Sequence, residues 1–453
     1  MSSDWPKVKL ADYCDKIGSG ATPRGGSKVY LDSGEISLVR SQNVYNHGFE
    51  YDGLVYIDED AAEKLSNVEL EENDVLINIT GDSVARVCMV PDDVLPARVN
   101  QHVSILRPKN GSLDPRFLRY SLLNHENQYK LLAIASAGGT RKAITKGHLE
   151  EFEISLPDIT YQKEVSEILS TFDQKIHLNQ QTNETLEAMA QATFKSWFVD
   201  FDPLRAKMEA KEAGRDPNRA AMAAISACTK VSADGAVLWD ETEVALDQKL
   251  ERMSDKQREH LEKTAGLFPE TLEESEIGEV PKGWGISKLE DYLTLSYGKG
   301  LRKKDRADGK VPVYGSGGLT GTHDESLIEG PGIIVGRKGT VGSIYWEDRD
   351  FWPIDTVFYV EPKKEVDLSF YYYLLNTLGL NEMNTDAAVP GLNRNNAYRL
   401  QILEFPEKLM KQFADFTSDL HKMMLVKKSE KKTLENIRYA LLPKLISGEV
   451  GYE

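Results

Sequence analysis

Two long stretches of the chain carry apolar residues at alternating spacings of three and four. The apolar positions include Val165, Ile168, Phe172 and Ile176 in the first stretch, over 159–201, and Phe413, Phe416, Leu420 and Met423 in the second, over 407–446. This spacing is the heptad pattern of helices that pair along an apolar seam. At 1.5 Å per residue each predicted helix is about 60 Å long, which exceeds the width of a typical domain.

Both predicted helices turn polar near their centres, at 179–183 (Asn-Gln-Gln-Thr-Asn) and at 427–432 (Lys-Lys-Ser-Glu-Lys-Lys). If the helices pair antiparallel, these polar centres lie opposite each other and the apolar ends meet. A polar layer of this kind fixes the register of a coiled coil and lowers its stability. The pattern predicts an antiparallel coiled coil. The alternative is two unrelated helices that each pack on their own globular part.

The segments that precede each long helix repeat one another in the same order. The matching pairs are 5–13 with 284–292, 103–109 with 357–363, 114–120 with 367–373, and 154–157 with 403–406. The second pair consists of apolar runs closed by a proline, which is typical of a strand that ends at a turn. Four matches in one order indicate a duplication. We therefore predict an α+β fold with an internal pseudo-twofold repeat: two similar α/β lobes separated by two long antiparallel coiled-coil helices.

The repeat also predicts the domain organisation. We expect a first lobe at 1–157, a first spacer helix at 158–201, a second lobe at 282–406, and a second spacer helix with the C-terminal tail at 407–453. The segment between the first helix and the second lobe, 202–281, is rich in Ala, Glu, Lys and Arg. We interpret this segment as short helices and linker without chemistry of its own.

Bulk properties narrow the classes of protein. The chain has 453 residues, of which 40% are hydrophobic, enough for two or three globular domains. No apolar run approaches the ~18 residues that cross a bilayer, and residues 1–10 lack a signal-peptide pattern. Three scattered cysteines indicate neither disulfides nor a zinc site. These features predict a cytoplasmic protein that does not associate with a membrane.

The net charge is −17, which by itself argues against nucleic acid, because phosphate contacts need Lys and Arg. Cations are nevertheless clustered locally, so the total does not decide. The glycine-rich segments at 18–23, 315–318 and 336–340 lack the spacing of the common nucleotide-binding motifs, and we interpret them as turns or DNA-facing loops.

One constellation resembles a metal-dependent nuclease site, in which carboxylates hold Mg²⁺ and a lysine steadies the attacking water. It comprises Asp355, Glu361 and Lys363. The repeat argues against it, because the equivalent positions of the first lobe carry Gln101 and Arg107. We therefore expect a structural role there, and we expect no catalytic residue and no metal ligand in this chain.

Side chains suited to DNA gather in a few polar segments of both lobes. Candidates for base edges are Arg40, Gln42, Asn43, Asn100, Gln101, His102, Asn393, Arg394 and Asn395. Candidates for phosphates and DNA-facing turns are Thr80, Ser83, Arg141, Lys142, Arg302, Lys303, Lys304, Ser316, Arg337 and Lys338. Each cluster alone is equally compatible with a solvated loop. Corresponding places strengthen the hypothesis, since 81–84 and 339–342 each follow an apolar strand.

Seven motifs along the chain together are typical of one known family. In the first half they are Asp-Val-Leu-Ile-Asn-Ile-Thr-Gly at 74–81, Val-Asn-Gln-His-Val at 99–103 and Ser-Trp-Phe-Val-Asp-Phe-Asp-Pro at 196–203. In the second half they are Tyr-Gly-Ser-Gly-Gly at 314–318, Ile-Val-Gly-Arg-Lys-Gly at 334–339, Pro-Ile-Asp-Thr at 353–356 and Leu-Pro-Lys-Leu-Ile-Ser-Gly at 442–448. Together these motifs resemble the specificity (S) subunits of type I restriction-modification systems. The resemblance covers nearly the whole chain, although 202–281 is longer than the minimal family pattern.

The resemblance implies two target recognition domains, each reading one half of a split sequence in double-stranded DNA. It also implies that the spacer helices dock two methyltransferase (modification) subunits, and that restriction/translocase subunits join the complex. S-adenosylmethionine, ATP and Mg²⁺ are then expected on these partners, with no cofactor bound by this chain and no catalysis of its own. Two alternatives stay open: a stand-alone Mg²⁺-dependent nuclease using Asp355, Glu361 and Lys363, and a coiled-coil scaffold that does not bind DNA.

Overall fold

The computed structural model describes residues 5–137, 142–233, 235–383 and 391–450. Contacts between Cα atoms divide the chain into two compact units. The first unit comprises Met1–Gln181 with Lys427–Glu453, and the second comprises Thr182–Val426. Each unit therefore holds one lobe together with part of each long helix.

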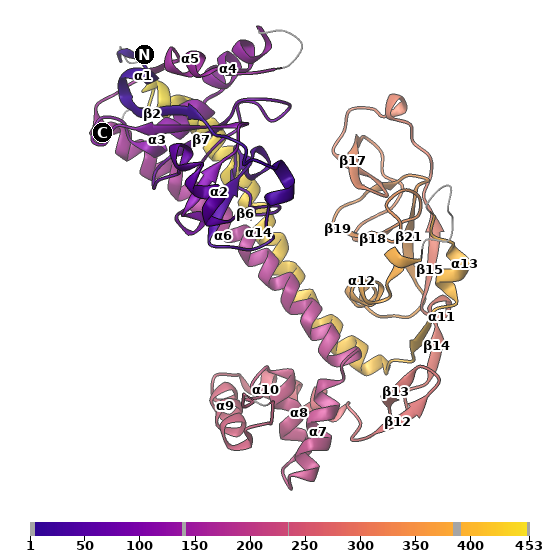
Figure 1. Ribbon diagram of the computed structural model, residues 1–453. Helices are drawn as coiled ribbons and strands as arrows, with labels where there is room; N and C mark the ends of the chain where they lie inside the picture. The colour runs from indigo at the N-terminus through magenta and orange to yellow at the C-terminus, as the bar shows by residue number, and fades with distance from the viewer. Residues whose placement is uncertain (1–4, 138–141, 234, 384–390, 451–453) are drawn as a thin grey trace. The chain divides into compact units, whose positions relative to one another are not determined.

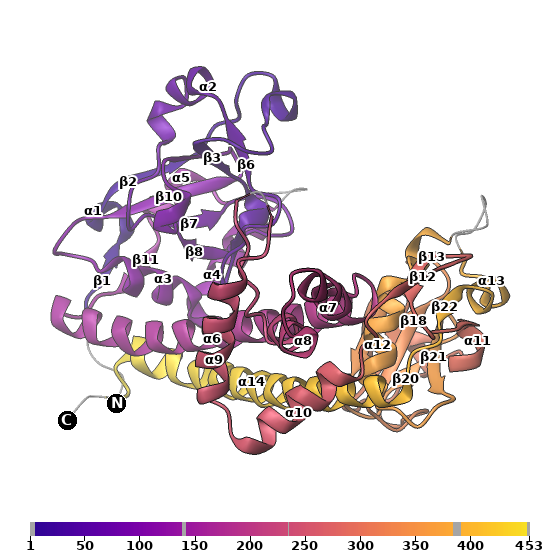
Figure 2. The same cartoon turned by 90° about the horizontal axis from the view of Figure 1, so that it is seen from below.

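The two predicted long helices are observed as α6 (Ile159–Phe198) and α14 (Glu407–Ser447), which run side by side (Figure 1, Figure 2). In the first unit Lys175 pairs with Glu430 (3.6 Å) and Gln180 accepts a hydrogen bond from Lys431 (3.1 Å). In the second unit the rings of Phe194 and Phe413 lie 5.3 Å apart. Residues later in α6 thus contact residues earlier in α14, which confirms an antiparallel coiled coil. None of the helices within the described ranges is apolar enough over its length to cross a bilayer.

The first lobe is built on four small sheets. A four-stranded antiparallel sheet has the order β2 (Cys14–Ser19), β10 (Val103–Pro108), β7 (Val75–Asn78), β8 (Val87–Met89). A three-stranded sheet has the order β6 (Val55–Ile57), β3 (Ile36–Val39), β9 (Ala97–Val99). β1 (Lys7–Lys9) pairs with β11 (Glu153–Ser155), and β4 (Val44–Tyr45) pairs with β5 (Gly48–Phe49). The helices are α1 (Leu10–Tyr13), α2 (Glu59–Glu63), α3 (Pro115–Leu123), α4 (His125–Ala137) and α5 (Lys146–Glu150).

The second lobe repeats this topology. Its four-stranded antiparallel sheet has the order β15 (Leu293–Tyr297), β21 (Val357–Pro362), β18 (Gly332–Gly336), β19 (Ile344–Glu347). Its three-stranded sheet has the order β17 (Gly318–His323), β16 (Val311–Gly315), β20 (Trp352–Pro353), and β14 (Ile286–Lys288) pairs with β22 (Gln401–Leu403). The helices are α11 (Leu289–Tyr292), α12 (Leu368–Thr377) and α13 (Arg394–Tyr398). The strand orders of these three sheets match those of three sheets in the first lobe, which confirms the internal repeat. The pair β4–β5 has no counterpart among the described residues of the second lobe.

The segment 202–281 is more than the short helices and linker that the sequence indicated. It forms α7 (Asp202–Glu212), α8 (Pro217–Ile225), α9 (Trp239–Glu251) and α10 (Asp255–Gly266), followed by the hairpin β12 (Leu272–Ser275) and β13 (Gly278–Pro281). Met222, Leu246 and Leu261 belong to a separate buried cluster in this bundle. The segment therefore has its own apolar core, which its charged composition concealed.

In the first lobe, the repeated motif Asp-x-x-Phe-x-x-Tyr attaches α3 to the long helix α6. The carboxylate of Asp114 caps α3 by accepting a hydrogen bond from the amide of Phe117 (3.0 Å), and it also accepts one from Ser166 of α6 (2.8 Å). The hydroxyl of Tyr120 donates to Asp173 of α6 (2.8 Å). A sequence motif that looked like a helix start is thus also the joint between lobe and coil.

Asp173 is the centre of a buried ionic cluster in this joint. It pairs with Arg119 of α3 (2.6 Å) and with Arg438 of α14. Burial opposes ionisation of Asp173, but the two guanidinium groups outweigh burial and lower the pKa of its carboxyl. One carboxylate therefore ties the first lobe to both long helices.

In the second lobe the same motif uses mainly aromatic packing. Asp367 caps α12 by accepting from the amide of Ser369 (2.9 Å), and Phe370 is fully buried. Tyr373 donates to Glu187 of α6 (3.2 Å). The rings of Phe370 and Phe194 of α6 lie 5.6 Å apart. The two lobes thus share the motif but are attached to the coil by different chemistry.

Candidate nucleic-acid interface

Four candidate segments of the first lobe meet at one end of its sheets. The amide of Asn100, after β9, donates to Val39 at the end of β3 (3.0 Å). The side chain of Asn78, at the end of β7, donates to the carbonyl of Ser41 (2.8 Å). The amide of Gly81 donates to the carbonyl of Lys142 (3.3 Å). These bonds bring together 40–43, 80–83, 100–102 and Lys142, which are remote from one another in the sequence.

The candidates of this end differ in exposure. Gln42, Gln101 and Lys142 are exposed, and Arg40, Thr80, Ser83 and His102 are half-buried. Gln42 donates to the carbonyl of Gly53 (3.1 Å), and Arg40 donates to the same oxygen. Thr80 and His102 share a hydrogen bond of 2.7 Å between Oγ1 and Nδ1. The loops are therefore held by their own side chains. Arg141 lies outside the described residues.

Two of the candidate side chains are buried and do not lie on the surface. Asn43 is fully buried: its amide nitrogen donates to the carbonyl of Glu50 (2.9 Å) and its oxygen accepts from the amide of Arg40 (3.0 Å). Asn100 is also buried, and its oxygen accepts from the amide of His102 (3.1 Å). Both side chains shape the loops from inside, so we withdraw them as base contacts.

The second lobe gathers Ser316, Arg337, Lys338 and the start of α13 at the corresponding strand ends. The amides of Arg337 and Lys338, after β18, donate to the carbonyl of Thr356 (2.9 and 3.1 Å). The amide of Ser316, after β16, donates to the hydroxyl of Thr356 (3.4 Å). The carbonyl of Arg337 accepts from the amide of Leu392 (2.8 Å), just before α13. The loops after β16 and β18, the turn before β21 and the start of α13 therefore lie together.

The candidates of the second lobe are mainly cationic. Arg302, Lys303, Lys304, Lys338, Asn393 and Asn395 are exposed, and Ser316, Arg337 and Arg394 are half-buried. Arg302 pairs with Asp305 (2.6 Å). Within the described ranges, Lys303, Lys304 and Lys338 form no ion pair. The oxygen of Asn393 caps α13 by accepting from the amide of Asn395 (2.9 Å), so that oxygen has a structural task.

Sequence reasoning missed the aromatic partners of these cations. In the first lobe the guanidinium of Arg40 lies over the ring of Tyr30 at 5.4 Å. Those of Arg337 and Arg394 both lie over Tyr297, at 4.7 and 4.8 Å. Such contacts are attractive because the face of an aromatic ring is electronegative. No sequence signal marks them, since the partners come from different strands and loops.

The constellation that resembles a nuclease site does not assemble. Asp355 lies in the turn before β21, and Glu361 lies near the far end of that strand, four strand residues or about 13 Å beyond Val357. The carboxylate of Glu361 accepts from Ser296, and Lys363 donates to the carbonyl of Glu290. In the part of the chain that is described, no three His, Cys, Asp or Glu residues are placed to hold a metal ion.

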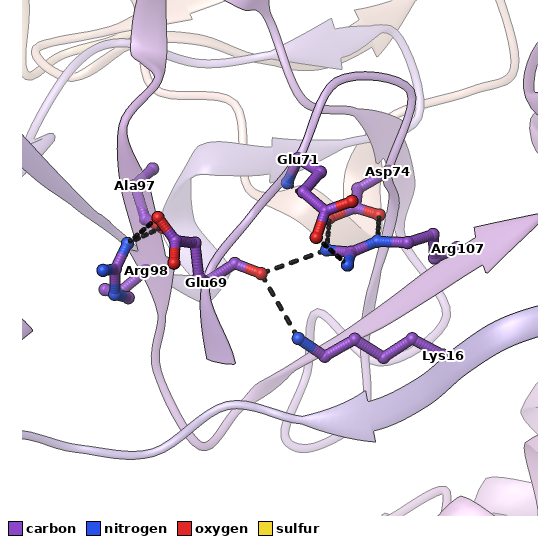
Figure 3. Close-up of polar contacts among 7 residues, drawn as sticks. All are labelled: Lys16, Glu69, Glu71, Asp74, Ala97, Arg98 and Arg107. Carbon is purple, nitrogen blue, oxygen red and sulfur yellow. Dashed lines mark hydrogen bonds and ion pairs between the residues drawn. The ribbon is translucent and has the colours of Figure 1, made fainter. Parts of the chain in front are cut away.

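The first lobe shows what the position of Glu361 does instead. Its equivalent, Arg107, makes two hydrogen bonds of 2.8 Å to the buried carboxylate of Asp74 (Figure 3). Arg107 also contacts Glu71 and the carbonyl of Glu69, to which Lys16 donates as well (3.3 Å). This network joins β2, β10 and β7 within one sheet. The position is structural, and the nuclease alternative has no support.

Comparison with known proteins gives consistent results. A family model described as "Type I restriction modification DNA specificity domain" matches residues 2–188 and 281–406. The chain is 26% identical to the type I restriction enzyme HindI specificity subunit of Haemophilus influenzae, over 99% of this chain and 100% of the relative. It is 21% identical to the MjaIX specificity subunit of Methanocaldococcus jannaschii, over 100% and 95%. The solved S subunit of a type I restriction-modification system from M. genitalium shares the fold, with a TM-score of 0.54 and 18% identity over 98% of this chain and 96% of that one.

Proposed function

Because the chain belongs to the family of the type I restriction-modification DNA specificity domain, we propose that it is a specificity subunit that reads a bipartite DNA site. Each lobe recognises one half of the site. The observation that carries this proposal is the duplicated topology, in which equivalent strand ends of both lobes present polar and cationic loops. The loops after β7 and β18, and the turns before β10 and β21, are the equivalent pairs.

The proposed DNA surface follows from exposure and chemistry. In the first lobe it comprises Arg40, Gln42, Thr80, Ser83, Gln101, His102 and Lys142. Arg141 lies outside the described residues and stays a prediction from the sequence. In the second lobe it comprises Arg302, Lys303, Lys304, Ser316, Arg337, Lys338, Asn393, Arg394 and Asn395. Lysines suit phosphates, whereas Arg and Gln also match base edges. Local cations of this kind allow DNA binding despite a net charge of −17.

We further propose that catalysis belongs to partner subunits in the cytoplasm. Two methyltransferase subunits dock on α6 and α14, and restriction/translocase subunits join them; S-adenosylmethionine, ATP and Mg²⁺ bind to those partners. Exposed apolar side chains on the long helices support docking, for example Met423 and Val426, which are 51% and 64% exposed. Exposed apolar surface of this kind commonly marks a protein interface.

Adding one heptad to both long helices is expected to lengthen the unread spacer between the half-sites. The insertions fall between Gln181 and Thr182 in α6 and between Val426 and Lys427 in α14, which antiparallel pairing places opposite each other. Each adds about 10 Å, or about 3 base pairs. Sequencing of the sites methylated by the assembled complex measures the spacer and both half-sites.

The control for this experiment is the heptad in α6 alone, which α14 cannot follow and which is expected to abolish methylation. Altered half-sites at a constant spacer would contradict the proposal, because the coil would then take part in reading bases. The paired insertion leaves all loop residues unchanged, so the half-sites are expected to stay as they are.

A second prediction separates the proposal from both alternatives. The purified chain with Mg²⁺ is expected not to cleave duplex DNA, either unchanged or as Asp355→Asn, because Glu361 and Lys363 are engaged in the fold. Binding of duplex DNA by the chain with its partners is expected to weaken as salt rises, since cations contact phosphates. Cleavage that Asp355→Asn abolishes would favour the nuclease, and the absence of any salt-dependent binding would favour the scaffold.

A further inference from the structure

Tyr297 is the shared platform for two arginines of the second lobe. It ends β15 next to Phe358 of β21, with the rings 5.0 Å apart, and 49% of its surface is exposed. The guanidinium carbons of Arg337 and Arg394 lie 4.7 and 4.8 Å from the centre of its ring. Tyr297 was not among the candidates from sequence, and an exposed tyrosine that packs against two cations calls for a physical reason.

The backbone fixes both arginines in this arrangement. Nη1 of Arg337 donates to the carbonyl of Asp355 (3.2 Å), and Nη1 of Arg394 donates to the carbonyl of Leu295 (3.4 Å). The segments that carry them are joined, because the carbonyl of Arg337 accepts from the amide of Leu392. Ring and carbonyls together restrict the rotamers of two long side chains, so little entropy is lost when they bind a ligand.

The electrostatics of this arrangement favour an electron-rich ligand. Two cationic side chains, those of Arg337 and Arg394, pack against one ring, and a third cation, Lys338, is the next residue after Arg337 in the sequence. Among the residues that the structure describes, neither arginine forms an ion pair with a carboxylate. Repulsion between neighbouring cations disfavours the arrangement unless a ligand that offers hydrogen-bond acceptors lies against it.

The remaining donors distinguish the two arginines. Nε of Arg394 is buried, so this residue offers mainly charge at the surface. In Arg337 only Nη1 has a hydrogen-bond acceptor among the described residues, which leaves Nε and Nη2. This pair of donors matches the O6 and N7 acceptors of guanine in the major groove.

We propose that Tyr297 is a positioning residue: it holds Arg337 so that Arg337 reads a guanine in the half-site recognised by the second lobe. Arg394 makes the second cation contact to the same ring. The inference rests on the proposed function and specifies it further, because it names one base of the half-site and the residue that reads this base. Tyr297 itself does not touch DNA. Its ring restricts the guanidinium of Arg337 to the plane in which two parallel hydrogen bonds to one base are made.

The experiment uses the chain assembled with its methyltransferase subunits. Competition binding with duplexes in which each position is changed in turn gives the discrimination at every base of both half-sites. R337K keeps the charge but loses the paired donors, and is expected to reduce discrimination at one guanine of one half-site about 5- to 150-fold. Y297L, which removes the ring, is expected to reduce discrimination at the same position. Y297F, which keeps the ring, is expected to retain the discrimination of the unsubstituted complex.

The control is R258K in the central bundle, where Arg258 also donates to a carbonyl, that of Leu250 (2.7 Å). R258K is expected to leave both half-sites unchanged. Uniformly weaker binding of all duplexes by R337K would overturn the proposal, because it would mean a phosphate contact. A lower melting temperature of Y297L with unchanged discrimination would overturn it too, because the ring would then only support the fold.

The half-site of the first lobe keeps this test separate from the proposed function. If the unsubstituted complex reads two half-sites and R337K leaves both intact, the proposed function stands and only the role of Arg337 is refuted. If the unsubstituted complex reads no bipartite site, the proposed function itself is refuted.

Discussion

Asp173→Asn is expected to lower the free energy of unfolding of the first unit by about 3–5 kcal/mol. The carboxylate is 19% exposed and lies between Arg119, which is 9% exposed, and Arg438. Asparagine has nearly the same shape but no charge, so two largely buried guanidinium groups lose their counter-ion. Urea unfolding measures the total effect, and hydrogen exchange of peptides from α3 locates it.

Asp419→Asn is the matched control for this change, because Asp419 and its partner Lys422 on α14 are 78% and 71% exposed. An exposed pair contributes little, so we expect a loss below about 1 kcal/mol. Equal losses in the two variants would show that the buried cluster does not hold the first lobe on the coil.

The same ionic cluster makes the stability of the first lobe depend on pH. The pKa of Asp173 is lower in the folded chain than in the unfolded one, because Arg119 and Arg438 outweigh its burial. Its contribution to stability is therefore complete above the unfolded pKa and is lost as the pH falls through the folded pKa. The protection factors of the α3 amides, which are their exchange rates relative to the intrinsic rates at the same pH, are expected to fall on acidification. Asp173→Asn is expected to remove this dependence.

The second large effect is expected from Phe194→Ala, which should lower the free energy of unfolding of the second unit by about 3–5 kcal/mol. Phe194 of α6 is 1% exposed, and its ring lies 4.9 Å from Phe198, 5.6 Å from Phe370 and 5.3 Å from Phe413. Truncation leaves a cavity where lobe, α6 and α14 meet. Urea unfolding and hydrogen exchange in α12 measure the loss.

Met189→Ala on the same helix is the control, since Met189 is 48% exposed. Substitutions of exposed side chains usually change stability by about 0.5 kcal/mol or less. If Phe194→Ala were as mild as this control, the aromatic cluster would not be what attaches the second lobe. The contrast between lobes is itself expected: the ionic joint of the first should respond to acid more strongly than the aromatic joint of the second.

The long helices and the repeat were predictable because their signals are local. Heptad spacing shows which side of a helix is apolar, and this placed α6 and α14 within a few residues of their observed ends. The repeat was visible because caps and strand-ending prolines, such as Asp114 and Pro108, recur in order. The short helices of 202–281 were predicted, but their shared core was not, because it is assembled from small and scattered apolar residues on several of these helices.

The candidate site was only half predictable. The duplicated architecture, the family and the segments rich in polar and cationic side chains could all be predicted from the amino-acid sequence. The burial of Asn43 and Asn100, and the packing of Arg337 and Arg394 on Tyr297, became visible only in the folded chain. The physical reason is that a polar side chain has the same identity whether it caps a loop or faces solvent, and its exposure is set by strands and loops that are remote in the sequence.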